Sequence, residues 1–443
     1  MIINFSIQNY KCLKDKVTLS FEPENSNRLE KYYITEPAKG IKLLKLGMLY
    51  GANGSGKTTL LEGLDFLRQL AITPRVLKQE QLDFEPFLFD QESRNAPTIF
   101  ELNFVCTGHR YLYELSVIKE QVIAEKLFYF TPKKALVFAR STDEVKQLTH
   151  IKFGSKIKLK KAEEDSLVTN TLWNATVLSG FLKTNIDSVE LREVTDWFID
   201  VLSQLITPKT DLFDSISRRL NNNTASKRNI LSFMQKADFG ITDILVEKKD
   251  ASIGNELKEL LILINEHQKK KGKGVDLKDI DTIDGIDIHF EHSVKQGNDY
   301  IQYGLPYADE SQGTKRYFQF SGLLHEMLTE TKIFIIDELE SSLHPDLVKH
   351  FLLLFLVNSS RSQLITTTHY RELLMERDML RDDVIWFTEK KPDGCIDLYS
   401  LSDFDSSVVR DTSSVFNAYK SGKLGAVPSL SDYYIDLSHG KNK

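Results

Sequence analysis

The chain has 443 residues, enough for about two or three domains, and its 41% hydrophobic and 27% charged residues are typical of a soluble globular protein. The longest apolar run, Phe351 to Val357, is far too short to span a membrane, and residues 1–11 alternate like a β-strand rather than a signal peptide. Three scattered cysteines and a net charge of −6 favour a cytoplasmic protein without a disulfide framework, a cysteine metal site or a global basic field.

The most informative segment lies near the N-terminus, where an apolar run from Leu43 enters the sequence GANGSGKT at residues 51–58. Its three glycines let successive backbone N–H groups face a polyphosphate. Lys57 supplies a charge for the outer phosphates, and the Thr58 hydroxyl can bind Mg²⁺. The alternative is an ordinary glycine-rich turn between a strand and a helix. The predicted nucleotide contacts are Asn53, Gly54, Ser55, Gly56, Lys57, Thr58 and Thr59.

The middle of the chain changes its periodicity. Residues 92–130 alternate as antiparallel strands with a hairpin turn at Thr107 and Gly108. From about 166 to 266 the period becomes helical, and residues 189–205 and 256–266 are the clearest predicted helices. No long heptad run is present, so we expect a compact helical insertion rather than a coiled-coil arm.

Two lysine clusters interrupt this region, one on a predicted strand and one in a glycine-containing loop. Either could contact a nucleic-acid backbone, and the favoured alternative is a solvated face or a flexible linker. No aromatic residues alternate with the lysines, so a single-strand stacking surface is not indicated. The clusters are Lys156, Lys158, Lys160 and Lys161, and Lys269, Lys270, Lys271 and Lys273.

Three later segments carry further candidate chemistry. The turn Ser311-Gln312-Gly313 precedes a helical stretch and could bind an anion, or simply cap that helix. Residues 332–338 form an apolar strand that ends in Asp337, a candidate Mg²⁺ ligand, and Glu338, a candidate general base. Two acids that only end a strand in solvent are the alternative for this segment. A second buried strand, residues 363–369, ends in His369, which could contact a γ-phosphate or be structural.

Taken in order, these segments resemble the ABC-class ATPases, which include transporter motors, RecF and SMC-type proteins. Residues 51–58 match the Walker A loop, 310–314 a degenerate signature motif, 333–338 Walker B, 340–345 the D-loop, and His369 the switch histidine. The signature departs from the family pattern because Gln312 stands where its first glycine would be. Gln91 is a candidate for the Q-loop glutamine, although a surface glutamine is an equal alternative.

This resemblance implies an α/β fold with a P-loop parallel sheet, an N-terminal antiparallel β subdomain and a mainly helical insertion. It also implies that the corner Asn9-Tyr10-Lys11 lies beside the adenine site. We expect the ATPase core at residues 1–130 and 281–400, the insertion at 131–280, and a tail at 401–443 that could bind a partner.

The mechanism that the resemblance implies is shared between two chains. They would sandwich ATP and Mg²⁺, so that Ser311, Gln312 and Gly313 of one chain reach the nucleotide of the other. Thr58 and Asp337 would hold the metal, while Glu338 and His369 would be catalytic.

Within the superfamily, the opening strand, the ELESSLHP turn and the tail resemble the compact RecF/OLD-like ATPases of anti-phage defence systems. Because OLD proteins carry a nuclease after the motor and only 74 residues follow His369, any nuclease or toxin would be a separate effector protein. A RecF-like DNA-repair ATPase is the alternative. A transporter motor would place the signature far closer to Walker A.

Overall fold

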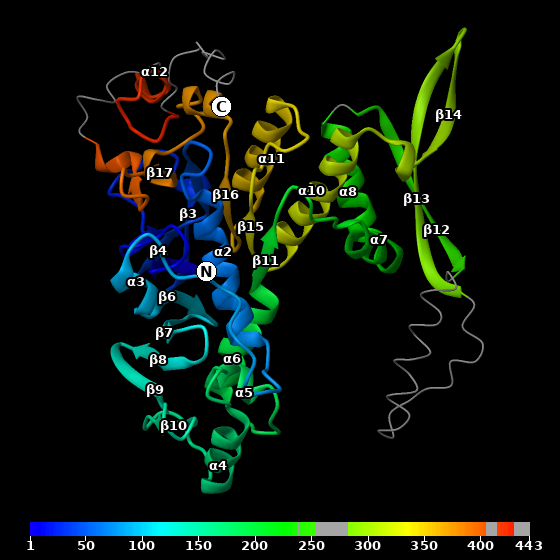
Figure 1. The fold of residues 1–443 in the computed structure, drawn as a ribbon. Coiled ribbons are helices and arrows are strands. Elements are labelled where there is room, and N and C mark those ends of the chain that lie inside the picture. Colours follow the sequence, from blue (N-terminus) through cyan, green and yellow to red (C-terminus); the bar gives the residue numbers. More distant parts are fainter. Residues whose placement is uncertain (238, 253–281, 405–413, 429–443) are drawn as a thin grey trace, which may run out of the picture. The chain divides into compact units, whose positions relative to one another are not determined.

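The computed structural model describes residues 1–237, 239–252, 282–404 and 414–428. The chain divides into two compact units, and Figure 1 labels most of their elements. Unit 1 comprises Met1–Lys209, Met327–Ser341 and Leu352–Lys443, and unit 2 comprises Thr210–Glu326 and Ser342–Phe351.

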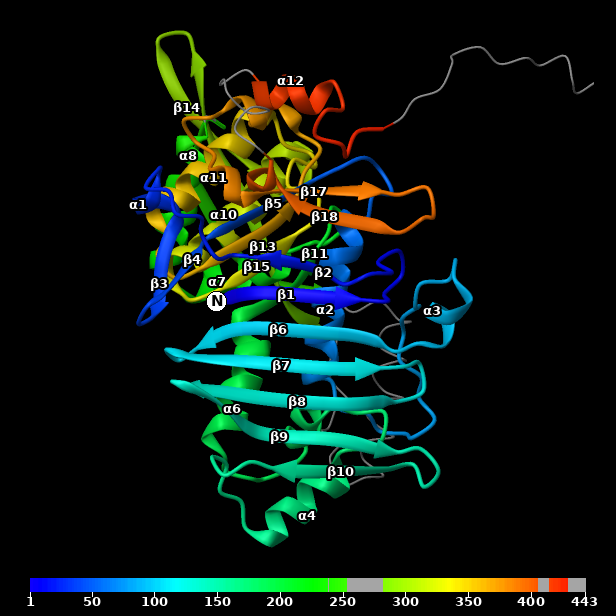
Figure 2. The same cartoon turned by 90° about the vertical axis from the view of Figure 1, so that its left-hand side faces the viewer.

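Unit 1 contains a seven-stranded antiparallel sheet with the strand order β10-β9-β8-β7-β6-β1-β2, which Figure 2 shows edge to edge. The predicted hairpin turn is confirmed, since Cys106 pairs with His109 and the turn residues Thr107 and Gly108 have φ of 47° and 79°. The strands are β1 (Ile2–Gln8), β2 (Val17–Ser20), β6 (Thr98–Cys106), β7 (His109–Val117), β8 (Val122–Thr131), β9 (Lys133–Asp143) and β10 (Leu148–Phe153).

The second sheet of unit 1 has the order β11-β15-β16-β5-β17-β18 and is parallel except for its edge strand β18. Its central strands are buried on both faces, which explains the almost wholly apolar sequences of β5 and β15. The mixed α/β fold with one parallel and one antiparallel sheet is therefore confirmed. The strands are β5 (Leu46–Tyr50), β11 (Leu202–Ile206), β15 (Ile333–Ile336), β16 (Gln363–Thr367), β17 (Ile385–Lys390) and β18 (Ile396–Ser400).

Shorter elements complete unit 1. A small sheet pairs β3 (Ile34–Ala38) with β4 (Ile41–Leu44). The helices are α1 (Glu30–Tyr33), α2 (Lys57–Ile72), α3 (Gln91–Asn95), α4 (Lys161–Asn170), α5 (Val177–Phe181), α6 (Val189–Asp196), the second half of α11 (Pro345–Asn358) and α12 (Ser414–Lys420). Helix α12 belongs to the predicted tail, and its Tyr419 stacks on Phe387 of β17 with ring centroids 5.4 Å apart.

One buried glutamine joins the two sheets of unit 1. Gln363, the first residue of β16, accepts a hydrogen bond from the backbone N–H of Ile2 at 2.6 Å. Its amide donates to the carbonyls of Ile2 at 2.9 Å and Leu44 at 3.0 Å. Since Gln363 has no exposed surface, these bonds fix the start of β1 against the parallel sheet.

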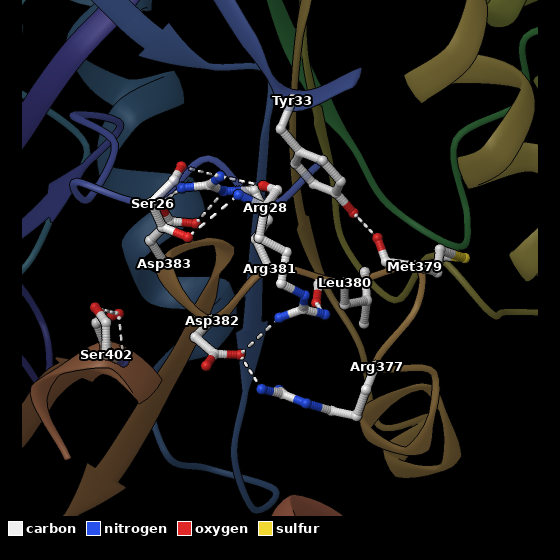
Figure 3. A network of polar contacts seen from close by, with 11 residues as sticks. Ser26, Arg28, Tyr33, Arg377, Met379, Leu380, Arg381, Asp382, Asp383 and Ser402 are labelled. Carbon is white, nitrogen blue, oxygen red and sulfur yellow. Dashed lines mark hydrogen bonds and ion pairs between the residues drawn. The ribbon is translucent and has the colours of Figure 1, made fainter. Parts of the chain in front are cut away.

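A polar network ties the segment after β2 to the segment before β17 (Figure 3). Arg381 forms a buried ion pair with Asp383, with Nη2 2.5 Å from Oδ2, and donates to the backbone carbonyls of Ser26 and Arg28. Tyr33 adds a hydrogen bond from its hydroxyl to the carbonyl of Met379 at 2.6 Å.

The described part of unit 2 combines several helices, among them the first half of α11, with a three-stranded antiparallel sheet of order β12-β13-β14. The rings of Phe290, Tyr307 and Phe318 contact one another in its core. The elements are α7 (Phe213–Asn222), α8 (Thr224–Lys236), β12 (Ile241–Ser252), β13 (Thr282–Gln296), β14 (Asp299–Pro306) and the first part of α10 (Gln312–Thr329). The helix predicted at 256–266 and the lysines at 269–273 lie outside the described residues.

The segment 131–280, predicted to be a mainly helical insertion, contains helices α4 to α8 and also strands. Strands β9 and β10 begin this segment and extend the antiparallel sheet, so a boundary at 130 would separate paired strands. The helix predicted over 189–205 ends earlier, because its last residues become β11 and pair with β15. The strand expected for the first lysine cluster is also wrong, since β10 ends at Phe153 and Lys161 begins α4.

Candidate functional site

The glycine-rich loop lies between β5 and α2, as the sequence predicts. Gly56 has φ of 89°, and a Cβ on it would lie 2.9 Å from Cγ1 of Ile396. A Cβ on Gly51 would lie 2.4 Å from the hydroxyl of Ser55. The loop can keep this path only with glycine at these two positions, because a side chain at either would collide with its neighbours.

Lys57 is the first residue of α2 and is 5% exposed. Its Nζ donates to the backbone carbonyls of Gly51 at 2.8 Å and Ala52 at 3.0 Å. Burial lowers the pKa of Lys57 to about 8, although the carboxylates of Asp337, Glu340 and Glu338 act in the opposite direction. A buried ammonium held only by carbonyls at the positive end of a helix suits a bound anion.

Asp337 follows β15 and brings a carboxylate beside the loop. The Thr58 hydroxyl lies 3.1 and 3.0 Å from its two oxygens, and the Thr367 hydroxyl donates to Oδ1 at 2.6 Å. Asp337 is 6% exposed. Hard oxygen donors next to a phosphate site fit Mg²⁺, which keeps several waters and needs few protein ligands. Among the described residues, no group of three or more His, Cys, Asp or Glu side chains is placed to hold a metal.

Glu338 and His369 follow two adjacent strands at the same edge of the sheet. Glu338 is exposed and has φ of 50°, a left-handed conformation that is uncommon outside glycine and often found at functional sites. Burial of its ring and the charge of Lys57 lower the pKa of His369, while the carboxylates of Glu340, Glu338 and Asp337 oppose this. His369 is therefore neutral at pH 7, with one nitrogen free to accept and one to donate.

These groups share one cavity of about 320 Å³. Its lining brings together the predicted loop contacts, both predicted metal ligands and both predicted catalytic residues. Cys12 is the one lining residue that the sequence did not suggest, and its thiol lies 3.4 Å from the Thr59 hydroxyl. The lining residues are Cys12, Asn53, Gly54, Ser55, Gly56, Lys57, Thr58, Thr59, Asp337, Glu338 and His369.

The predicted signature residues lie in unit 2, at the start of α10. The Ser311 hydroxyl accepts a hydrogen bond from the backbone N–H of Thr314 at 3.1 Å and so caps the helix. Ser311 and Gln312 are exposed, and Gly313 is partly buried. They do not line the cavity described above, and their role at a nucleotide stays a prediction.

The N-terminal corner, expected beside the adenine, is held by hydrogen bonds to the chain that precedes β6, and its role at a nucleotide stays a prediction. The Asn9 amide donates to the carbonyls of Ser93 and Ala96, both at 2.8 Å, and its oxygen accepts from the N–H of Phe87 at 3.0 Å. Asn9 thus fixes the chain before β6, and Tyr10 is buried at 3% exposure. Gln91, the candidate Q-loop residue, is exposed in α3 and does not line the cavity.

The family described as "AAA domain, putative AbiEii toxin, Type IV TA system" matches residues 48–165 and 179–376, well over half of the chain. The chain belongs to this family. The matched segments contain the loop, Asp337, Glu338 and His369, and they confirm the prediction of an ATPase-type nucleotide-binding domain. The narrower resemblance to RecF/OLD-like defence proteins stays a prediction.

Similar solved structures include the SMC head domain from Thermotoga maritima, with 13% identity and a TM-score of 0.41, covering 90% of this chain and 98% of that one. The Smc head domain from Pyrococcus furiosus has 11% identity and a TM-score of 0.34, with 90% and 96% covered. No curated protein matches the sequence. Among the described residues, no helix is both long and apolar enough to cross a membrane.

Proposed function

We propose that this chain binds and hydrolyses ATP with Mg²⁺. The observation that carries the proposal is the joint presence of Lys57, the Thr58–Asp337 pair, Glu338 and His369 around one cavity. An ordinary glycine-rich turn would not require a buried ammonium and a buried carboxylate at the same edge of a parallel sheet.

Each group has a part in this reaction. The loop N–H groups, the start of α2 and Lys57 bind the phosphates, because all of them present positive charge. Thr58 and Asp337 hold Mg²⁺, which when bound neutralises charge on the phosphate oxygens. Glu338 accepts a proton from the attacking water, and neutral His369 hydrogen-bonds the γ-phosphate.

The proposal includes a nucleotide-dependent homodimer or higher homo-oligomer. The exposed Ser311 and Gln312 are available to a second chain, and the neighbouring N–H groups at the start of α10 suit an anion. The helix has eighteen residues, so its N-terminal end carries the full dipole expected of a long helix. The ATP sandwich would complete each cavity with the turn of the partner.

The biological role we propose is that of a sensor or switch in anti-phage defence that controls a separate nuclease or toxin. The family description, which names a putative toxin and a type IV toxin–antitoxin system, supports a role in such a conflict system. Part of the C-terminal segment packs through Tyr419 on the ATPase core, which supports coupling between nucleotide state and a partner bound at the tail.

ATP turnover by the full chain, measured with Mg²⁺ and with EDTA, tests the enzymatic proposal. Turnover that needs Mg²⁺ and is lost in Glu338→Gln, with a shift of that variant to a dimer in light scattering on adding ATP, is the expected result. Wild-type turnover in Glu338→Gln would remove this residue from the base role. Strong stimulation by any DNA duplex would favour the RecF-like repair ATPase over the partner switch.

A further inference from the structure

The ends of β15 and β16 are held together beyond their regular pairing. The Thr367 hydroxyl lies 2.6 Å from Oδ1 of Asp337 and accepts from the N–H of Glu338 at 2.7 Å. The N–H of Leu339 donates to the Thr367 carbonyl at 3.1 Å. These bonds fix the positions of Asp337 and Glu338 relative to Thr367, but they stop short of His369.

Glu340 makes the next connection. Its Oε1 accepts a hydrogen bond from the backbone N–H of His369 at 2.6 Å, a short distance that indicates a strong, charge-assisted bond. The negative charge of Glu340 also raises the pKa of Lys57 and of His369. Glu340 therefore lies close to the cavity, although it is not one of the lining residues.

Two ordinary explanations for Glu340 fit poorly. A solvated surface glutamate would expose both oxygens, yet Oε2 is buried. A glutamate that only braces the fold would engage both oxygens, yet Oε2 has no hydrogen-bond partner among the described residues. Leaving a buried carboxylate oxygen unpaired is costly, so the position is better explained by what Oε1 holds.

We propose that Glu340 is a positioning residue that holds the backbone of His369, and therefore its imidazole, in register with Glu338. The proposal rests on the ATPase function proposed above and adds a residue that acts within its own chain. Since a displacement of about 1 Å can cost about 10²-fold in rate, one bond to the backbone of a catalytic histidine is enough to matter.

The experiment compares Glu340→Ala, Glu340→Gln, His369→Ala and the double variant Glu340→Ala/His369→Ala. Glu340→Ala is expected to lower kcat by about tenfold to a hundredfold while the Kd for a non-hydrolysable ATP analogue changes by less than about threefold. Glu340→Gln keeps an oxygen acceptor for the His369 N–H and is expected to retain kcat within about threefold of wild type. The double variant should be no slower than His369→Ala, because Glu340 acts through that residue.

Thermal unfolding and analogue binding confirm that each variant is folded. Wild-type kcat in Glu340→Ala would overturn the positioning role while leaving the ATPase proposal intact. So would a Glu340→Gln variant as slow as Glu340→Ala, or fully additive losses in the double variant. Absence of turnover in the wild-type chain would overturn the proposed function and this role with it.

Discussion

Two buried lysines in unit 1 look alike until their helices are compared. Lys45 is 2% exposed and Lys57 is 5% exposed. Burial lowers the pKa of each to about 8. Each donates to two backbone carbonyls, Lys45 to those of Leu356 at 2.8 Å and Ser359 at 2.6 Å. By burial, pKa and hydrogen-bond count, the two sites cannot be distinguished.

The ends of the helices distinguish them. Lys45 binds carbonyls at the C-terminal end of α11, where the helix dipole stabilises a cation. Lys57 lies at the N-terminal end of α2, where the same dipole is unfavourable to a cation and favourable to an anion. Lys45 therefore has a structural role, while the position of Lys57 favours binding of an anionic ligand. A lowered pKa alone does not identify a functional lysine. A lowered pKa at the N-terminal end of a helix, where the dipole disfavours a cation, does.

Lys57→Met should have the largest effect on binding. Removing the ammonium removes charge-assisted hydrogen bonds to the phosphates, so the nucleotide affinity should fall by about 10²-fold, or about 3 kcal/mol. The free energy of unfolding should change by less than about 1 kcal/mol, because removing an ammonium at the positive end of α2 offsets the loss of its bonds to the Gly51 and Ala52 carbonyls. Isothermal titration with an ATP analogue and urea denaturation measure the two quantities. Wild-type affinity would show that the loop is not a phosphate site.

Lys45→Met is the matched control and should show the opposite pattern. It leaves the last carbonyls of α11 without their donor, so the free energy of unfolding should fall by about 2 kcal/mol. The nucleotide affinity of the folded protein should stay within about twofold of wild type. A comparable loss of affinity in this variant would mean that the two lysines are not independent and that the contrast between them is wrong.

The same comparison explains how much could be predicted from the sequence. The loop at 51–58, the acids ending β15 and the histidine after β16 were all predictable, because glycine spacing and apolar runs are local signals. The parallel arrangement then brings their ends together at one edge. Lys45 carries no local signal, since its partners lie more than 300 residues away on the chain.

Local sequence patterns predict the wrong secondary structure where pairing with a distant segment decides it. Residues 202–206 continue a helical pattern but become β11, because they pair with β15. Strand β9 was missed because its sequence mixes charges with apolar residues, including Arg140, which is buried and donates to the Trp173 carbonyl at 2.8 Å. Cys12 reaches the cavity only through the fold of the N-terminal corner.

Asp337→Asn should have a smaller effect that is specific to the Lys57 site. The variant loses the charged Mg²⁺ ligand, so the gain in nucleotide affinity on adding Mg²⁺ should fall by about tenfold, while binding in EDTA should change little. Oδ1 of Asp337 lies within reach of both the Thr58 and the Thr367 hydroxyls, and asparagine keeps this oxygen, so the fold should survive. Titrations with and without Mg²⁺ test this, and an undiminished Mg²⁺ effect would place the metal ligand elsewhere.

The smallest expected effect is a pH dependence that separates the two lysines. Both have a pKa of about 8, below the ordinary value of 10.5, so the unfolded chain binds more protons between these values. Each lysine therefore raises the free energy of unfolding as pH increases from about 8 to 10.5. Binding of an anion requires charged Lys57, so nucleotide affinity should instead fall above about pH 8, by up to about tenfold per pH unit.

Lys45→Met and Lys57→Arg separate the pH dependence of stability from that of nucleotide affinity. Lys45→Met should lose part of the rise in stability and keep the whole fall in affinity. Lys57→Arg, which stays charged, should lose the fall in affinity, because an arginine does not titrate in this range. Nucleotide Kd and the urea midpoint, measured from about pH 7.5 to 9.5 for all three proteins, decide the matter. If the nucleotide affinity of Lys57→Arg falls with pH as much as that of the wild type, the titrating group is not Lys57. The anion site would then not depend on the helix end that distinguishes Lys57 from Lys45.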